Sequence, residues 1–189
     1  IKEYSWSVPT PTAIAAIAEL IDNRRLLEIG AGSGLWSSLL NATGISVTAT
    51  DDYSWTALMN EKKQRLPSGF TVPAGRFFPV EQLDGPTAVR KYPEHQALLV
   101  CWPPPDRSWA FQALACFQGD QVVFIGDKGC TADEAFYAEL ATGWQQHHEI
   151  SIPTWPGIHD AIYLYERKIW RGPTASPDQT RHPYLTKME

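Results

Sequence analysis

A glycine-rich turn near the start of the chain has the residue types needed to bind a charged small molecule. It spans residues 28–34 (EIGAGSG), between an apolar run at residues 25–29 and a helix-like pattern at residues 35–41. Glycines let a backbone bend tightly and approach a ligand closely. The N-terminus of the following helix presents free N–H groups and a partial positive charge, which suit a carboxylate. Because Glu28 can face an ammonium group, the turn suits both charges of an amino-acid head group.

A second acidic residue, Asp51, ends the next strand-like run and stands where the ribose of a nucleotide-like ligand would lie. Its carboxylate can accept hydrogen bonds from two ribose hydroxyls, and Asp52 is the alternative. A dinucleotide fingerprint requires glycine or alanine at position 35, where this chain has Leu35. A nicotinamide-dependent oxidoreductase is therefore disfavoured. Glycines alone could simply join a strand to a helix, but the acids on both sides of them favour a ligand site.

A tryptophan followed by three prolines ends another apolar run, residues 97–102 (ALLVCW). In open α/β sheets, ligands bind beyond the carboxyl ends of the strands. We therefore expect Trp102 and Pro103 to contact a substrate. The alternative is that the prolines only terminate the strand stiffly.

The segment from Trp155 to Asp160 joins the last two expected strands and opens on the same side. Trp155 is a further candidate for contact with substrate, since indole rings favour flat or apolar acceptors. His159 and Asp160 are the best pair to accept or orient a substrate proton. Each also has a structural alternative, a solvated histidine and an aspartate that caps a turn. The His147-His148 pair has no third ligand at metal spacing, so no metal site is expected.

The elements that must position these residues alternate between strand-like and helix-like patterns. Thr10 is expected to cap a first helix with Pro11 at its first position, and Asp84 to cap a short one ending near Lys91. The other helices are expected at residues 35–41, 54–63, 108–118 and from a capping box at 131–134 to about 143. The expected strands are residues 25–29, 45–50, 76–80, 97–102, 121–126, 149–152 and 161–167.

This alternation predicts an α/β fold, a doubly wound and mostly parallel seven-stranded sheet. No helix separates the last two strands, so the final strand should run antiparallel to the rest. We expect a single domain over residues 1–170, with an N-terminal helical lead-in, and a polar, proline-containing tail over 171–189. The leading Tyr4-Ser5-Trp6 segment either folds over the ligand pocket or packs against the sheet edge.

The composition and charge of the chain restrict the kinds of partner that it is expected to bind. The net charge is −5 and the basic residues are scattered, which disfavours a phosphate-binding surface and hence nucleic acid. No apolar run approaches the roughly 18 residues that span a bilayer. The N-terminus has no signal-peptide pattern, and three widely spaced cysteines form no disulfide framework. We expect a cytoplasmic protein with a small-molecule substrate and no membrane partner.

The glycine-rich turn resembles the first motif of class I S-adenosylmethionine-dependent methyltransferases, an acid-x-Gly-x-Gly-x-Gly loop, and Asp51 resembles their ribose-binding acid. The order of elements from Thr10 to Arg167 is similar to their Rossmann-like fold, so the resemblance covers nearly the whole chain. It implies S-adenosylmethionine as cofactor, held by Glu28, Gly30, Gly32, Gly34 and Asp51. It also implies a contact to adenine after the third strand, for which the candidates are Glu81, Gln82 and Leu83.

The Trp-Pro-Pro segment resembles the Asp/Asn-Pro-Pro-aromatic motif of amino-methylating relatives, with two departures. Trp102 stands where the polar residue belongs and Pro105 where the aromatic belongs. Trp-Pro-Pro also resembles a group of uncharacterised methyltransferase-like proteins. The resemblance implies methyl transfer to a small, partly aromatic acceptor. The alternatives are an inactive methyltransferase-like binding or scaffold protein, which the altered motif favours, and a nucleic-acid methyltransferase.

Overall fold

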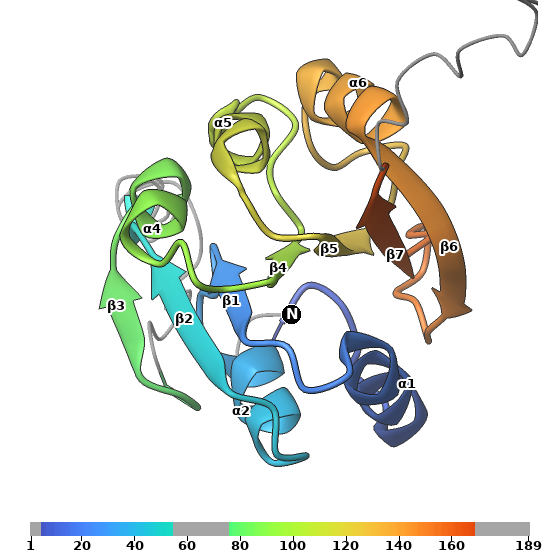
Figure 1. Ribbon diagram of the computed structural model, residues 1–189. Coiled ribbons are helices and arrows are strands. Elements are labelled where there is room, and N and C mark those ends of the chain that lie inside the picture. Colours follow the sequence, from blue (N-terminus) through green and yellow to red (C-terminus); the bar gives the residue numbers. More distant parts are fainter. Residues whose placement is uncertain (1–4, 55–75, 169–189) are drawn as a thin grey trace, which may run out of the picture.

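A single twisted sheet forms the centre of the molecule. The computed structural model describes residues 5–54 and 76–168, and Figure 1 shows how their elements are arranged. The seven strands lie in the order β3-β2-β1-β4-β5-β7-β6. They are β1 (Leu26–Ile29), β2 (Val47–Asp51), β3 (Val80–Gln82), β4 (Ala97–Cys101), β5 (Gln121–Gly126), β6 (Trp144–Ser151) and β7 (Ala161–Arg167). The helices are α1 (Pro11–Ile21), α2 (Leu35–Asn41), α4 (Gly85–Lys91), α5 (Trp109–Cys116) and α6 (Glu134–Gly143).

Helices cover both faces of this sheet, α1 and α2 on one side and α4, α5 and α6 on the other (Figure 1). Each side has its own hydrophobic core, and the central strands contribute to both. In β4, Leu98 and Val100 join the core under α4 to α6, whereas Ala97 and Leu99 join the core under α1 and α2. Strands buried on both faces explain the continuous apolar runs in the sequence.

The expected strand directions are confirmed. β1 pairs in parallel with β2 and β4, β2 with β3, and β4 with β5. β7 lies between β5 and β6 and runs antiparallel to both. All the parallel strands therefore end at one edge of the sheet, which is also where β7 begins. We call this the carboxyl edge.

Several helix ends follow from side-chain capping. Thr10 Oγ1 accepts a hydrogen bond from the Ala13 N–H at 3.1 Å, and Asp84 Oδ1 accepts one from the Thr87 N–H at 2.9 Å. Both caps are therefore confirmed. The expected capping box at residues 131–134 is wrong in detail, because Asp133 is the cap of α6. Thr131 instead donates its hydroxyl proton to the Asp127 carbonyl at 2.7 Å.

The first, second and fourth strands differ from expectation by one or two residues at an end, and two other strands differ more. The third strand begins at Val80 rather than ending there, since it pairs with the end of β2. The sixth begins at Trp144, directly after α6, and is mostly exposed along its polar QQHHE stretch. An edge strand needs few apolar residues, so the sequence of β6 shows only a weak strand pattern and its first half was not predicted. The expected helix at residues 54–63 and the expected tail lie largely outside the described residues.

None of the helices that the structure describes is long and apolar enough to cross a bilayer.

Candidate functional site

The three glycines of the turn between β1 and α2 share a left-handed backbone but have different surroundings. Gly30, Gly32 and Gly34 have φ of +69°, +53° and +74°. A Cβ on Gly30 would lie 2.8 Å from the Trp109 ring, and one on Gly34 would lie 2.8 Å from Phe78 Cβ. A Cβ on Gly32 would meet no atom within 4 Å in the described part of the chain. Gly30 and Gly34 therefore allow close packing within the protein, while Gly32 is the one glycine of this turn whose Cβ position is not crowded by the described residues.

Asp51 is joined directly to this turn. Its Oδ2 accepts a hydrogen bond from the Gly32 N–H at 2.8 Å, and its Oδ1 accepts one from the Tyr53 N–H at 2.6 Å. A carboxylate has about four acceptor positions, so further donors such as hydroxyls can still bind. Burial raises the pKa of the Asp51 carboxyl, against the lowering effect of these two bonds. The neighbouring Asp52 is exposed and accepts from the Ser54 N–H at 2.8 Å.

Glu28 lies beneath the turn rather than at its surface. Its side chain is buried, and the Ser37 hydroxyl of α2 donates a hydrogen bond to its Oε2. Loss of solvent raises the pKa of Glu28 to about 7, although the Ser37 bonds oppose the shift. Glu28 therefore holds the turn to α2, and its burial favours the neutral form of the carboxyl.

The three candidates for contact with adenine differ in their surroundings at the end of β3. Lys91 and Tyr92 both donate hydrogen bonds to the Glu81 carboxylate. These bonds hold the Glu81 side chain against the end of α4. Leu83 packs against the core. Gln82 is exposed and lies opposite Asp51 in the strand register. Of the three, Gln82 is the best placed to meet a ligand held at Asp51.

Trp102, directly after β4, has a backbone conformation that is rare for a bulky residue. Its φ is +53°, and its N–H donates to the Ile125 carbonyl at 2.9 Å. Its indole Nε1 donates to Asp160 Oδ2 at 3.1 Å. Pro103 is buried, and its carbonyl accepts a hydrogen bond from the Ala132 N–H at 2.7 Å. Trp102 thus points across the edge toward the start of β7.

The two candidate proton acceptors have opposite environments. The side chain of His159 is 85% exposed, and its Nδ1 lies 3.4 Å from Asp127 Oδ2. Asp160 is only 5% exposed, and burial raises the pKa of its carboxyl. Asp127 also accepts the His159 backbone N–H at 2.8 Å and so fixes the position of this loop. Asp160 has the more unusual environment of the pair.

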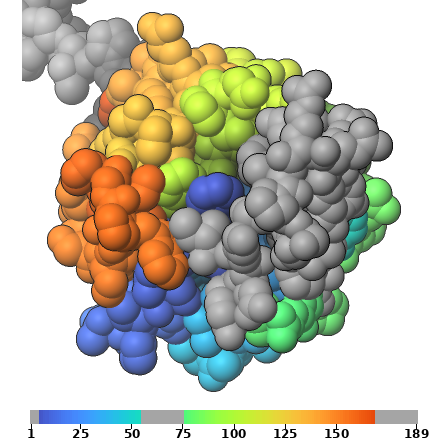
Figure 2. All heavy atoms as spheres, turned by 180° about the vertical axis from the view of Figure 1, so that it is seen from behind, coloured from blue at the N-terminus to red at the C-terminus, as the bar shows by residue number. Residues whose placement is uncertain are grey.

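Trp6 and Asp127, which were not among the predicted site residues, also contact these side chains. The Trp6 ring stacks on Trp102 with centroids 5.3 Å apart and planes at 22°, and Trp155 Nε1 donates to the Trp6 carbonyl at 2.9 Å. Figure 2 shows the N-terminal segment in dark blue in the middle of this face, beside the orange residues near β7. Trp6 was expected only as part of the leading segment that folds over the ligand pocket or packs against the sheet edge. Asp127 directly follows the apolar strand at residues 121–126, and this position at a strand end could have identified it as a candidate site residue.

Trp102, Trp155, His159 and Asp160, which were expected to open on the same side of the sheet, all lie at its carboxyl edge. Trp102 and Asp160 are in direct contact, Trp155 joins them through Trp6, and His159 projects into solvent. All lie at the carboxyl edge, where the glycine-rich turn also lies. Among residues 5–54 and 76–168, no group of three histidines, cysteines or acids is arranged to hold a metal ion.

Comparison with known proteins places the fold. No protein-family model matches the sequence, and no curated protein matches it. Solved structures do match. TrmN from Thermus thermophilus superposes with a TM-score of 0.52 and 18% identity, over 85% of this chain and 49% of TrmN. The chain thus spans about half the length of TrmN.

Two further structures cover larger shares of their own chains. Magnesium protoporphyrin IX methyltransferase (ChlM) from Synechocystis PCC 6803, with bound SAM, superposes with a TM-score of 0.50 and 10% identity, over 83% of this chain and 79% of ChlM. The methyltransferase domain of bacterial CtHen1 superposes at 0.53 and 12% identity, over 82% and 96%. The protein has the class I methyltransferase fold, as the sequence predicted.

Proposed function

We propose that this protein transfers the methyl group of S-adenosylmethionine to a small, partly aromatic acceptor. The observation that carries the proposal is the hydrogen bond between the Gly32 N–H and Asp51, beside a face of Gly32 that is open. That arrangement couples the turn to an acidic residue at the carboxyl edge of a sheet with the class I methyltransferase fold. In such sheets, ligands bind at this edge.

The residues present fit the cofactor. Gly32 leaves room for a ligand backbone, and the first N–H groups of α2 suit its carboxylate. Asp51 keeps acceptor positions for the ribose hydroxyls, while Gly30 and Gly34 hold the shape of the turn. Glu28 lies beneath them, bonded to Ser37, and would supply negative charge to an ammonium group when its carboxyl is ionised. When bound, S-adenosylmethionine supplies the electrophilic methyl group.

The catalytic contribution of the chain would be mainly alignment and exclusion of water. Methyl transfer from a sulfonium is an in-line displacement, and good orientation alone can contribute about 7–11 kcal/mol. Asp160, buried and fixed by Trp102, is the group best placed to orient or accept an acceptor proton. His159 is assigned a supporting role at the solvent side, where Asp127 holds its loop.

The acceptor is proposed to be small and to contain a flat apolar part. Trp102 and Trp155 supply indole surfaces, and the buried Pro103 sets the direction in which the chain leaves β4. The acidic residues at this edge and the net charge of −5 disfavour a nucleic acid. The free cysteines Cys101, Cys116 and Cys130 support a reducing, cytoplasmic setting.

Titration calorimetry with S-adenosylhomocysteine and, separately, with NAD tests the cofactor. We expect micromolar affinity for S-adenosylhomocysteine, about −8 kcal/mol, and no binding of NAD. The reverse preference, or no binding of either ligand by the folded protein, would remove the proposal.

A binding protein without transferase activity is the second candidate. This candidate is favoured by the Pro103 carbonyl, which already accepts the Ala132 N–H and so keeps only one lone pair for an acceptor. It predicts normal binding of S-adenosylhomocysteine together with no methyl transfer from labelled S-adenosylmethionine to any planar amine or phenol tested.

A further inference from the structure

The segment from Ser5 to Pro9, which we call the strap, crosses the carboxyl edge without regular secondary structure. Ser5 Oγ accepts a hydrogen bond from Trp36 Nε1 of α2 at 3.2 Å. Ser7 is buried, and its Oγ lies 3.5 Å from Cys101 Sγ at the end of β4. The strap therefore connects the helix after the glycine-rich turn with the strand that ends at Trp102.

Asp160 lies beneath this strap with one oxygen unused. Its Oδ2 accepts the Trp102 indole N–H at 3.1 Å, whereas its Oδ1 is buried and has no hydrogen-bond partner within the described part of the chain. A buried acceptor without a donor is costly and rare in native proteins. Burial raises the pKa of this carboxyl, and the nearby Asp127 charge and the Ser7 hydroxyl affect the pKa in opposite directions. The Ser7 hydroxyl is near enough to lower the pKa of the carboxyl, but Oδ1 accepts no hydrogen bond within the described part of the chain, so it can accept one from an outside donor.

Trp102 is held in a strained backbone conformation next to this carboxylate. Its φ of +53° is unfavourable for a bulky residue, and the following proline also disfavours helical backbone before it. Strain of this kind persists where the surrounding structure enforces it, and it concentrates at functional sites. The conformation presents one indole face to the strap and the indole N–H to Asp160.

Ser7 of the strap is part of what buries Asp160, so movement of the strap would open a route to Oδ1. The oxygen is buried, and Ser7 of the strap lies against the Asp160 carboxyl. Lifting the strap would also remove the Trp6 ring from Trp102, because Trp6 stands next to Ser7 in the chain. The stacked pair shows that a flat ring fits on this face of Trp102, with centroids 5.3 Å apart.

We propose that Trp6 occupies the place of the acceptor's ring. The acceptor is a planar ring with an N–H or O–H group at its edge, which displaces Trp6, stacks on Trp102 and donates to Asp160 Oδ1. Trp155 holds the strap in the closed position through its bond to the Trp6 carbonyl. Negative charge from Asp160 and Asp127 disfavours an anionic ring. That this ring is the methyl acceptor rests on the proposed function, whereas its binding does not.

Indole and 1-benzofuran are suitable probes, because they have the same shape and only indole carries an N–H group. Ligand-observed NMR with the full chain, with and without S-adenosylhomocysteine, measures their dissociation constants. We expect indole to bind about tenfold more tightly than benzofuran, since a hydrogen bond to a charged group is lost. We expect Asp160→Leu to reduce that preference to about twofold or less.

One variant in the strap and one at Trp155, which bonds to it, test whether Trp6 is displaced by the ring or helps to hold it. Trp6→Ala should tighten indole binding about threefold or more, because the site no longer has to be vacated. Trp155→Phe should tighten it in the same direction by a smaller factor. Phe111→Leu, in the groove between α4 and α5, is the matched control and should change nothing. Weaker indole binding by Trp6→Ala would overturn displacement, and equal binding of both probes by the parent protein would overturn the role of Asp160.

Binding of S-adenosylhomocysteine and binding of indole test the two proposals separately. Binding of S-adenosylhomocysteine together with failure of the indole tests would remove only this inference. Binding of indole with the expected variant effects, but none of S-adenosylhomocysteine, would support the ring site and remove the proposed methyl transfer.

Discussion

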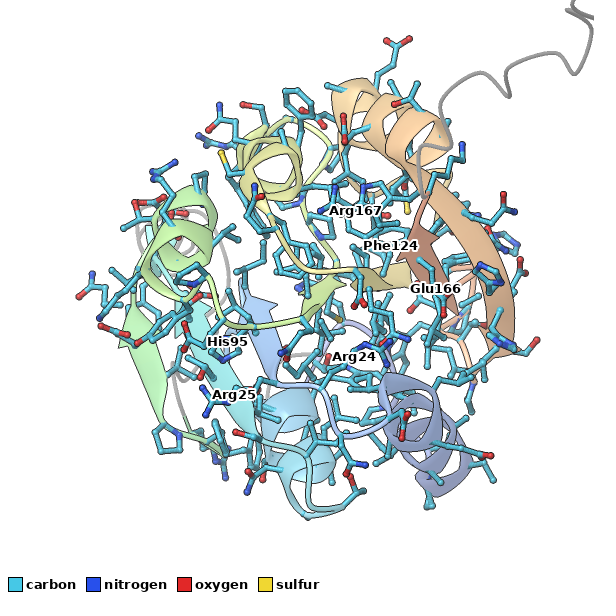
Figure 3. All side chains as sticks on the ribbon, in the orientation of Figure 1. Arg24, Arg25, His95, Phe124, Glu166 and Arg167 are labelled. Atoms are coloured by element: carbon cyan, nitrogen blue, oxygen red, sulfur yellow. The ribbon has the colours of Figure 1, made fainter. Side chains whose placement is uncertain are left out.

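The two edges of the sheet differ in how their charged side chains are paired. At the amino edge of the parallel strands, which faces the viewer in Figure 3, Arg24 lies 3.1 Å from Asp120 and Arg25 lies 3.7 Å from Glu94. Arg167, also labelled there, donates to the Phe117 and Gly119 carbonyls at 2.6 and 2.8 Å. Burial lowers the pKa of His95, which favours its neutral form. The charged side chains named here are therefore paired with an acid or bonded to carbonyls, and the histidine is neutral.

At the carboxyl edge, three buried or partly buried carboxyls have raised pKa values, those of Glu28, Asp51 and Asp160. No lysine or arginine of the described residues forms an ion pair with any of them. Burial of like charges without counter-ions costs stability. Positive φ angles at the glycine-rich turn and at Trp102 add strain to the same edge. The difference indicates that the amino edge stabilises the fold and the carboxyl edge is arranged for a ligand.

The largest effect that tests this contrast is expected from Gly32→Val. A valine there would project into the open space where the ligand backbone approaches, so affinity for S-adenosylhomocysteine should fall at least about a hundredfold. The positive φ should also cost about 1–3 kcal/mol of stability. Gly44→Val is the matched control, with φ of +99° and open space around its Cβ, but outside the site. Calorimetry should show a normal dissociation constant for Gly44→Val, and retained affinity in Gly32→Val would show that the turn faces something else.

Glu28 should make stability fall as pH rises. Its folded pKa of about 7 lies above the ordinary value of 4.5, so the folded state binds the proton more tightly than the unfolded state. The resulting stabilisation is complete below pH 4.5 and is lost as pH rises toward 7, by up to about 3 kcal/mol.

Denaturant unfolding at pH 5 and pH 8 measures this loss. Glu28→Gln keeps a neutral hydrogen-bonding side chain beside Ser37, so this contribution to the pH dependence should be absent from the variant. An equal loss of stability between the two pH values in both proteins would mean that another group is responsible.

Asp51→Ala should weaken S-adenosylhomocysteine binding by about 1–3 kcal/mol, because the ribose hydroxyls and the Gly32 N–H lose a charged acceptor. Asp52→Ala is the control, since Asp52 is exposed and bonds only locally to Ser54 among the described residues. Calorimetry on both variants decides between them. Normal affinity in Asp51→Ala with a loss in Asp52→Ala would move the ribose contact one residue along.

Most of the fold could be predicted because its signals are local. The capping residues Thr10 and Asp84, the glycine-rich turn and the doubly buried strands each determine structure through neighbouring atoms. β6 was expected too short, because an exposed edge strand obtains its hydrogen bonds from β7 and not from its own apolar pattern.

The candidate site was harder to anticipate, since its defining contacts join residues far apart in sequence. The sequence indicated Trp102 and Asp160 separately, but not that one oxygen of Asp160 would accept the indole N–H while the other stays buried without a donor in the described chain. The stacking of Trp6 on Trp102 spans 96 positions and depends on the strap's path. Pro103, which is expected to contact a substrate, is buried, and its carbonyl accepts the Ala132 N–H, a contact across 29 positions that its sequence neighbours do not indicate.

The smallest expected effect is at the amino edge, where Arg25→Ala removes an exposed ion pair with Glu94. Exposed pairs contribute little, because water screens them and ordering two long side chains costs entropy. The free energy of unfolding should therefore change by less than about 0.5 kcal/mol, and the dissociation constant for S-adenosylhomocysteine should stay the same. Denaturant unfolding and calorimetry on the same sample check both values. A clear loss of cofactor affinity would mean that the two edges are coupled through β1, which begins directly after Arg25, and the division between a stabilising edge and a binding edge would have to be abandoned.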